Sequence, residues 1–416
     1  MKNTFLKITL LFFLSLLGLI SCNQKETANK PSPLPTGTRI SSMGSTASSP
    51  FLTKDHKNRP VLSWVEGQEK DTYFHYAVSL DHGLSFSKPI KVSTTKGLSN
   101  HSESMAKIAF KSNGTAFILF QKRKPNKDNR FAGAIYYTQS KDKETSWTPP
   151  QYLHTDTSGG IGRSFFDIST LPDGQIGAIW LDGRKKNKIG STLYFAKTST
   201  DKGFGKDTEI GNKTCQCCRT DIYVDQHHNI NITYRDIIQD TIRDISYIVS
   251  KDNGNTFSKP KRISADNWVI NGCPHTGPTI AENKEGLHFF WFSKGGGKAG
   301  VYHTSTSNHG KTFRPRIPIH SIARHPQSTS YSNKKVALIW NEAFKKNDIV
   351  KNKIGYQKFT PSPMAANVSE PEVQYLTPDS VDAHFPVIIQ LDTNTLIAAW
   401  SQKEKKYSSI YYTQLH

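Results

Sequence analysis

The chain has 416 residues, of which 35% are hydrophobic, 11% aromatic and 21% charged. Its 28 Gly and 21 Pro, with only 4 Met, favour many short strands joined by turns over a helical bundle. The aromatic content excludes an intrinsically disordered chain. Lys and Arg exceed Asp and Glu by 54 to 34, and the resulting formal charge of +20 favours anionic partners.

The N-terminus carries the features of an export signal. Lys2 and Lys7 are followed by an apolar run over residues 8–20. This run is too short to span a bilayer comfortably and is typical of the hydrophobic region of a signal peptide. We therefore predict that the protein is exported.

The end of the apolar run, Leu19-Ile20-Ser21-Cys22, resembles the bacterial lipobox. The resemblance implies that residues 1–21 are removed as a lipoprotein signal peptide and that Cys22 carries the lipid. Because Asn and not Asp follows Cys22, it also implies attachment to the outer membrane, facing the periplasm or the cell surface. Ordinary secretion is the alternative.

The predicted mature chain is still strongly basic, with a formal charge of +18 after the loss of Lys2 and Lys7. Export makes nucleic acid an unsuitable partner, so we expect anionic carbohydrate and an anionic membrane surface instead. Residues 22–44, rich in polar residues and Pro, are predicted to be a tether. We expect the protein to be a monomer.

A run of about five apolar residues that ends in an aromatic residue recurs after residue 45. The terminal aromatics, 49 to 60 residues apart, are Trp64, Phe120, Trp180, Tyr234, Trp291, Trp340 and Trp400. A turn precedes each run and an alternating aromatic segment follows it, which is the signal of successive strands. Repeats of three or four strands in about 50 residues indicate β-propeller blades. We predict an all-β, seven-bladed propeller in one domain, residues 45–416, with six blades and a separate hairpin as the alternative.

The last repeat stops after its third strand, at His416. An unpaired strand edge invites aggregation, so another segment should cover it. We expect residues 36–43 to supply the missing outer strand and to close the ring.

A second motif follows the third strand of several repeats. Residues 79–86 and 250–257 fit Ser-x-Asp-x-Gly-x-x-aromatic, and residues 140–147, 199–203 and 306–313 are partial copies. These resemble the Asp boxes, or BNR repeats, of the sialidase superfamily. The resemblance covers about residues 45–416 and implies a sialidase-like propeller with exo-α-sialidase-like glycoside hydrolase activity. Locally, the Asp caps a tight turn and the Gly supplies a positive φ, so the boxes are predicted to stabilise the fold.

In a propeller, the first strand of each blade begins, and the second ends, on one common face. This rule predicts a mouth lined by basic residues that would bind the acid group of a sugar, because Arg binds carboxylates bidentately. The predicted substrate-binding residues are His101, Arg163, Arg184, Arg219, Arg235, His275, His325 and His384. The four arginines are expected to form one dense cationic wall.

Three acidic residues at the ends of second strands are candidate catalytic groups. Asp182 and Asp236 each stand next to an arginine, so each is either a general acid or the partner that orients that arginine. Glu342 has no cation beside it in the sequence and is therefore the freer acid or base candidate.

The four cysteines other than Cys22 are Cys215, Cys217, Cys218 and Cys273. Cys218 and Cys273 occupy equivalent positions in neighbouring repeats, so we expect two disulfides, one of which joins Cys217 or Cys218 to Cys273. A copper or zinc site that also uses nearby histidines is the alternative, and a reactive thiol is a third possibility.

The leading hypothesis is an exported lipoprotein that acts on anionic glycans and, if it is an enzyme, hydrolyses them from one end without a cofactor. The superfamily's Phe-Arg-Ile-Pro motif has as its nearest match Thr38-Arg39-Ile40-Ser41, and no counterpart of its Tyr/Glu pair is evident. These departures favour a non-catalytic glycan- or protein-binding propeller as the alternative. A copper- or zinc-binding propeller and a polysaccharide lyase are the other candidates.

Overall fold

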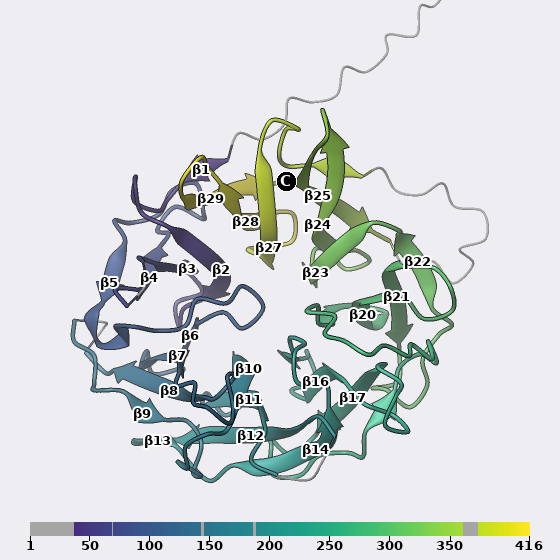
Figure 1. The fold of residues 1–416 in the computed structure, drawn as a ribbon, viewed down its shortest axis with the longest axis horizontal. Helices are drawn as coiled ribbons and strands as arrows, with labels where there is room; N and C mark the ends of the chain where they lie inside the picture. Colours follow the sequence, from purple (N-terminus) through teal and green to yellow (C-terminus); the bar gives the residue numbers. More distant parts are fainter. Residues whose placement is uncertain (1–36, 69, 143–144, 186–188, 361–372) are drawn as a thin grey trace, which may run out of the picture. The chain divides into compact units, whose positions relative to one another are not determined.

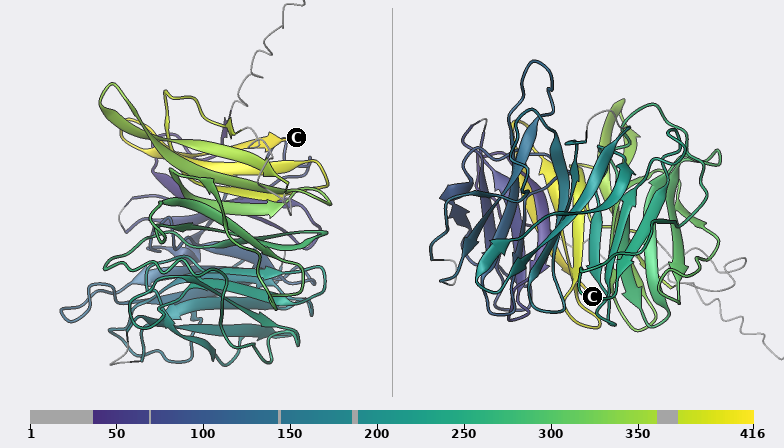
Figure 2. Two further views of the ribbon diagram at one scale, coloured as in Figure 1. Left: turned by 90° about the vertical axis from the view of Figure 1, so that its right-hand side faces the viewer. Right: turned by 90° about the horizontal axis from the view of Figure 1, so that it is seen from below.

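The computed structural model describes residues 37–68, 70–142, 145–185, 189–360 and 373–416. All of them lie in a compact unit over residues 34–416. Figure 1 shows its sheets arranged radially about a central axis, and Figure 2 shows them from the side. The predicted signal peptide, Cys22 and most of the predicted tether lie outside the described residues. No helix in the described part of the chain is long and apolar enough to cross a membrane.

Seven antiparallel sheets follow one another along the chain, which confirms the seven-bladed prediction. Blade 1 contains β2 (Ala47–Lys54), β3 (Pro60–Glu66), β4 (Tyr73–Val78) and β5 (Ile90–Val92), and blade 2 contains β6 (Lys107–Phe110), β7 (Ala116–Arg123), β8 (Gly133–Ser140) and β9 (Gln151–Tyr152). Blade 3 contains β10 (Arg163–Thr170), β11 (Ile176–Asp182) and β12 (Ser191–Ser199), with β13 (Lys202–Phe204) and β14 (Thr208–Thr214) both paired to β12. Blade 4 contains β15 (Asp221–Val224), β16 (Ile230–Arg235), β17 (Ile245–Ser250) and β18 (Lys261–Arg262).

The remaining blades repeat this arrangement. Blade 5 contains β19 (Thr279–Asn283), β20 (Gly286–Ser293), β21 (Gly300–Thr306) and β22 (Ile317–His320). Blade 6 contains β23 (Ala323–Ser330), β24 (Val336–Lys346), β25 (Ile349–Phe359) and β26 (Gln374–Tyr375). Blade 7 contains β27 (Asp382–Gln390), β28 (Leu396–Lys403), β29 (Ser408–Leu415) and, from the N-terminal end, β1 (Thr38–Arg39).

The ring is closed by the strand that the sequence placed there. Strand β1 pairs antiparallel with β29, with Thr38 opposite Tyr412 and Arg39 opposite Tyr411. The two strands lie side by side near the C-terminus in Figure 1. The propeller therefore includes residues that precede position 45.

Both faces of the second strands are buried, as expected for sheets that pack face to face in a ring. All seven residues of β3 are buried. Apolar clusters join neighbouring blades: Phe117 and Leu119 of blade 2 pack with Ile168 and Trp180 of blade 3. These shared clusters hold adjacent sheets together and fix the positions of their strand ends around the axis.

The Asp boxes form the local turns that the motif predicts. In blade 4, Ser250 Oγ and the backbone N–H of Thr256 donate to Asp252 Oδ1, each at 2.8 Å. Hydrogen bonds from the Thr256 side chain and backbone lower the pKa of Asp252 to about 2. Gly254 has φ +83°, where a side chain would be strained, and its N–H donates to Ser250 Oγ. The box is thus a fold element, away from the mouth.

Two histidines are buried side by side in blade 5. His288 Nδ1 lies 3.0 Å from His303 Nε2, and His288 Nε2 lies 2.9 Å from Asn283 Oδ1. Burial and the charge of Arg314 lower the pKa of His288 to about 4, and burial lowers that of His303 well below its usual value. The pair is therefore neutral at pH 7.

Acid should destabilise the fold through this pair. A histidine whose pKa is lowered on folding stabilises the protein above its unfolded pKa of about 6.5 and loses that contribution as the pH falls towards the folded value. We expect the free energy of unfolding to drop by about 1–2 kcal/mol between pH 7 and pH 5 because of His288. Urea unfolding at both pH values should show a smaller drop in His288→Gln, whereas the exposed control His82→Asn should behave as wild type. Equal drops in all three proteins would contradict this prediction.

Candidate functional site

The strand register brings the predicted site residues to one face of the ring. Arg163, at the start of β10, lies opposite Asp182, at the end of β11. In blade 6, Ala323 and Glu342 occupy the corresponding positions. The beginnings of first strands and the ends of second strands therefore meet around the axis, in what we call the mouth.

A recurrent β-bulge shapes this mouth. The register of the first strand shifts near its start in blades 1, 3, 6 and 7. Within each shift one residue adopts a positive φ of 49–58°: Ser49, Phe165, His325 and Phe385. Such a conformation is costly for bulky residues, by roughly 1–3 kcal/mol each, and bulges commonly re-aim side chains at functional sites. Of the predicted site residues, His325 therefore occupies one of these strained bulge positions, and Phe385 directly follows His384.

The histidines gather in two groups. His101 and His275 have ring centroids 6.2 Å apart. In the second group, the Phe385 ring lies between His325, at 4.6 Å, and His384, at 6.1 Å. Burial lowers the pKa of both His101 and His384. Phe385 had no role in the sequence prediction, although it stands beside His384 in the sequence.

Arg219 forms a buried bridge across the mouth. Its Nη1 lies 3.1 Å from Glu103 Oε1, and its Nη2 donates to the backbone carbonyl of Pro326 at 2.8 Å. It thus joins blade 4 to the segment before blade 2 and to blade 6. A Cβ on Gly277 would lie 2.2 Å from the Arg219 carbonyl oxygen, so only glycine fits against this backbone. Glu103 was missed, because no sequence pattern links it to an arginine 116 positions away.

Arg163 and Arg184 are held by carboxylates of the protein itself. Arg163 Nε donates to Asp182 Oδ2 at 3.1 Å, and Arg184 Nη2 donates to the same oxygen at 2.6 Å. Arg184 also pairs with Asp207 at 2.5 Å, and Arg163 with Asp156 at 3.4 Å. The expected cationic wall is therefore not formed: these two arginines and Arg219 are bound to acids, and their contacts favour a structural role.

Two of the catalytic candidates accept the indole N–H of the tryptophan two residues earlier. Trp180 donates to Asp182 at 3.2 Å, and Trp340 donates to Glu342 at 2.9 Å. Glu342 is also bonded by the Tyr375 hydroxyl at 2.8 Å and has a 2% exposed side chain. The expectation that Glu342 is a freer group is wrong, because Trp340 on its own strand already donates to it. Its other neighbours, His320, Lys353 and Tyr375, come from other strands.

Asp236 differs from the other two acids. Its carboxylate accepts hydrogen bonds from Ser246 Oγ and from the backbone N–H of Ile237, each at 2.9 Å. It forms no ion pair within the described residues, and burial raises its pKa. Of the three candidates, it is the one whose surroundings favour a protonated acid.

Arg235 is buried beside Asp236 but does not point to a carboxylate. Its guanidinium donates to the backbone carbonyls of Arg243 and Phe292, both at 2.8 Å, and lies 4.9 Å from the Trp268 ring. It therefore fastens blade 4 to blade 5. It has no ion pair with any described residue.

Three cysteines converge next to Arg235. The Sγ atoms of Cys215 and Cys217 lie 3.6 Å apart, those of Cys215 and Cys218 lie 3.7 Å apart, and all three are buried. Hydrogen bonds from Cys217 and Cys218 lower the pKa of Cys215 to about 3, with Arg235 as a further cause. Cys273 is exposed and is not in this group, and all four are free thiols. The predicted disulfide to Cys273 is thus not formed in the structure, because the other three cysteines turn into the core between blades 3 and 4.

Arg324 is an exposed cation at the mouth, and none of the described acidic residues pairs with it. It directly precedes His325, and its guanidinium lies 3.7 Å from the centre of the Phe292 ring. It forms no ion pair with the described part of the chain. Partial burial lowers its pKa, so an anionic ligand would supply the charge that it lacks.

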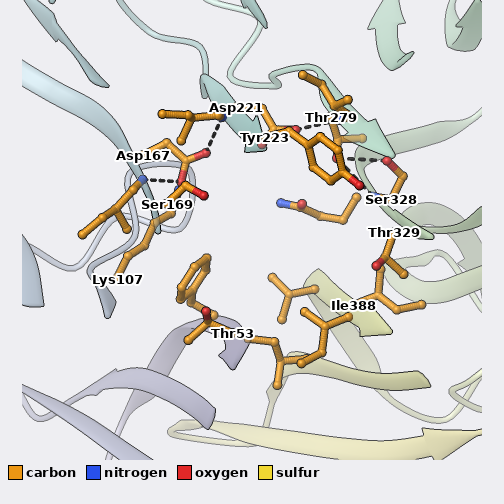
Figure 3. Close-up of a pocket in the computed structure, with 18 of the residues that line it drawn as sticks. Thr53, Lys107, Asp167, Ser169, Asp221, Tyr223, Thr279, Ser328, Thr329 and Ile388 are labelled. Atoms are coloured by element: carbon orange, nitrogen blue, oxygen red, sulfur yellow. Dashed lines mark hydrogen bonds and ion pairs between the residues drawn. The ribbon is translucent and has the colours of Figure 1, made fainter. Parts of the chain in front are cut away.

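A cavity of about 450 Å³ lies in the axial channel and is lined by the first strands of all seven blades. Figure 3 shows Lys107, Asp167 and Asp221 on its wall. Lys107 Nζ lies 2.7 Å from Asp167 Oδ1. Burial and the charge of Asp167 raise the pKa of Asp221 to about 7. Because Lys107 is already neutralised, the channel is a poorer anion site than the mouth.

Comparison with known proteins agrees with this geometry. Residues 63–269 match the model of the BNR repeat-like domain family. The chain is a seven-bladed β-propeller that contains a BNR repeat-like domain. A search of curated protein sequences finds no significant match.

Several solved structures share the fold of this BNR propeller. A protein of unknown function from Dyadobacter fermentans is 13% identical, with a TM-score of 0.55, over 92% of this chain and 98% of that chain. The BP39L lectin from Burkholderia pseudomallei is 10% identical, with a TM-score of 0.54, over 90% and 96%. A point mutant of the NanB sialidase from Streptococcus pneumoniae is 12% identical, with a TM-score of 0.51, over 94% and 72%. At these identities the likeness concerns the fold.

The bridge between Arg219 and Glu103 should be a large contributor to stability. Replacing Arg219 with Met leaves Glu103 buried without its partner, which should cost about 3–5 kcal/mol of unfolding free energy. Replacing both, as Arg219→Met with Glu103→Leu, should recover most of the loss. Urea unfolding measures all three proteins. Lys96→Met, which removes an exposed ion pair with Asp71, is the control and should unfold almost as wild type. An Arg219→Met variant whose free energy of unfolding is close to that of the wild type would contradict this prediction.

Proposed function

We propose that this BNR propeller binds an anionic carbohydrate at the mouth, where Arg324 holds the acid group. The observation that carries the proposal is an exposed guanidinium with no acidic partner among the described residues. Arginine binds carboxylates through two parallel hydrogen bonds, which gives direction as well as affinity. A sialate, a uronate or a sugar sulfate has the required charge.

The other side chains at the mouth suit a sugar ring. The Phe385 ring contacts those of His325 and His384, and His325 directly follows Arg324 in the sequence. Aromatic faces provide apolar contact area at low entropic cost, and imidazole nitrogens are hydrogen-bonding groups for hydroxyls. The solved relatives include proteins that are named a lectin and a sialidase, which supports carbohydrate as the ligand class.

The acids at the mouth favour binding without cleavage. Asp182 and Glu342 are buried and fully engaged by tryptophan, arginine and tyrosine donors, whereas a general acid must reach the glycosidic oxygen. Exo-glycoside hydrolysis of the sialidase type stays the alternative, with Asp236 as the acid because burial raises its pKa. Binding at the mouth requires no cofactor in either case.

We further propose that lipid on Cys22 attaches the propeller to the outer membrane as a monomer. The resemblance of residues 19–22 to a lipobox supports this, and a basic charge favours an anionic membrane surface. Incorporation of labelled palmitate that is lost in Cys22→Ser, with fractionation of the envelope, tests the attachment.

A metal site is a second candidate function, separate from the mouth. Three cysteine Sγ atoms lie within 4.8 Å of one another in the core, a grouping that copper and zinc both favour. Elemental analysis combined with thiol counting tests it. One equivalent of metal would support the site, and three free thiols without metal, even after reconstitution, would remove it.

Removing the guanidinium should weaken acid-sugar binding. Loss of a charge-assisted bidentate contact corresponds to roughly a 10- to 100-fold weaker affinity. Calorimetric titration with N-acetylneuraminic acid and with glucuronic acid should show this loss in Arg324→Ala. Lys251→Ala, in an exposed turn of the blade 4 Asp box, matches the charge change and should bind as wild type.

Two outcomes would overturn the proposal. If the wild-type protein binds no acidic sugar, anionic carbohydrate is excluded as its ligand. Binding that is unchanged in Arg324→Ala removes the mouth as the site. Turnover of a fluorogenic sialoside that is abolished in Asp236→Asn would replace non-catalytic binding with hydrolysis.

A further inference from the structure

The three buried thiols have the spacing of ligands around one metal ion. Two ligand sulfurs bound at about 2.3 Å to the same ion lie roughly 3.8–4.0 Å apart for tetrahedral or trigonal angles. The separations from Cys215 Sγ are 3.6 Å to Cys217 and 3.7 Å to Cys218. Small movements of the sulfurs would therefore complete a three-sulfur site.

The surroundings of this cluster select for a soft ion. Cys215, Cys217 and Cys218 pack in the apolar cluster between blades 3 and 4, with Ile222 and Ile237 among its members. In the described part of the chain, no histidine or carboxylate joins the three sulfurs. Zinc normally takes four ligands, whereas thiolates in a dry pocket suit Cu(I), for which three sulfurs are sufficient.

A buried positive charge stands beside the cluster. Arg235 has a 1% exposed side chain and no ion pair with any described residue, and its Nε has no hydrogen-bond partner. The Cys215 backbone N–H donates to the Arg235 carbonyl at 2.8 Å, so the two residues are fixed together. A buried cation without a counter-charge is costly, and a negatively charged metal–thiolate group would provide one.

We propose that Cys215, Cys217 and Cys218 bind one Cu(I) ion through their three sulfurs, with Arg235 as the neighbouring counter-charge. This inference rests on the metal site proposed above and names its ion and its ligand number. Each thiol that binds releases its proton to solvent, and no oxidation step is involved. Because Cys218 precedes Arg219, the bound ion would also brace the residue that bridges the mouth.

Titration of the purified protein with Cu(I), under anaerobic and reducing conditions, tests the proposal. In competition with a coloured Cu(I) chelator, the wild type should bind one equivalent. Cys215→Ser, Cys217→Ser and Cys218→Ser should each bind at least 100-fold more weakly. Cys273→Ser is the matched control, since it removes the exposed cysteine outside the cluster, and it should bind as wild type.

X-ray absorption of the copper-loaded wild type is a second measurement, and it does not depend on whether the variants fold. Three sulfur neighbours at about 2.3 Å, without nitrogen or oxygen, are expected. A fourth ligand, or a loss of binding in Cys273→Ser, would overturn the three-cysteine site. If one equivalent of Zn(II) binds and Cu(I) does not displace it, the assignment of Cu(I) is wrong, although the metal site itself is supported. Failure of both ions to bind would remove the metal site itself.

Discussion

The pairing of β1 with β29 keeps the ring of blades closed, and the rest of the molecule depends on that closure. Each sheet buries both faces against its neighbours, so an open ring would expose two apolar faces and a strand edge. The bond from the Ile40 backbone N–H to the Ile410 carbonyl, at 3.0 Å, continues the pairing beyond the two-residue strand. Closure fixes where each inner strand begins, and therefore which side chains meet at the axis.

The convergence of inner strands explains why a strained bulge recurs at the mouth in four blades. Strands that approach a common axis have little room for regular pairing, and a bulge relieves the crowding while it turns one side chain towards the opening. Phe165, His325 and Phe385 hold positive φ values there at an energetic cost that regular strands would avoid. Such strain is retained where the surrounding structure enforces it, and its position coincides with the aromatic and histidine surface.

The partners of the arginines separate structural charges from functional ones. Arg163 and Arg184 share Asp182, and Arg219 is paired with Glu103, so these three stabilise the scaffold. Arg324 and Arg235 have no acidic partner among the described residues. One is exposed at the mouth and the other is buried beside three thiols. The buried guanidinium of Arg235 is costly without a counter-charge, whereas the exposed guanidinium of Arg324 is accessible to an anionic ligand.

The sequence by itself determined the features that depend on local periodicity. Alternating strands at a regular spacing specified the seven blades, and the motif specified the Asp-box turns, because each of these forms from residues close in the chain. The missing fourth strand of the last repeat pointed to residues 36–43 as the closing segment, and β1 lies within it. It also contained an unused signal: the acids at positions 66, 182 and 342 each follow a tryptophan by two residues, on the same side of a strand.

Only the tertiary structure decided which charged groups form ion pairs and which thiols are buried together. Glu103 and Arg219 lie 116 positions apart, and their pairing follows from the closed ring and from nothing near either residue. Cys218 and Cys273 hold equivalent places in neighbouring repeats, yet Cys218 turns into the core while Cys273 remains in solvent. A repeat pattern gives the position of a residue along its strand. The direction of its side chain is set by the bulges and loops that packing imposes.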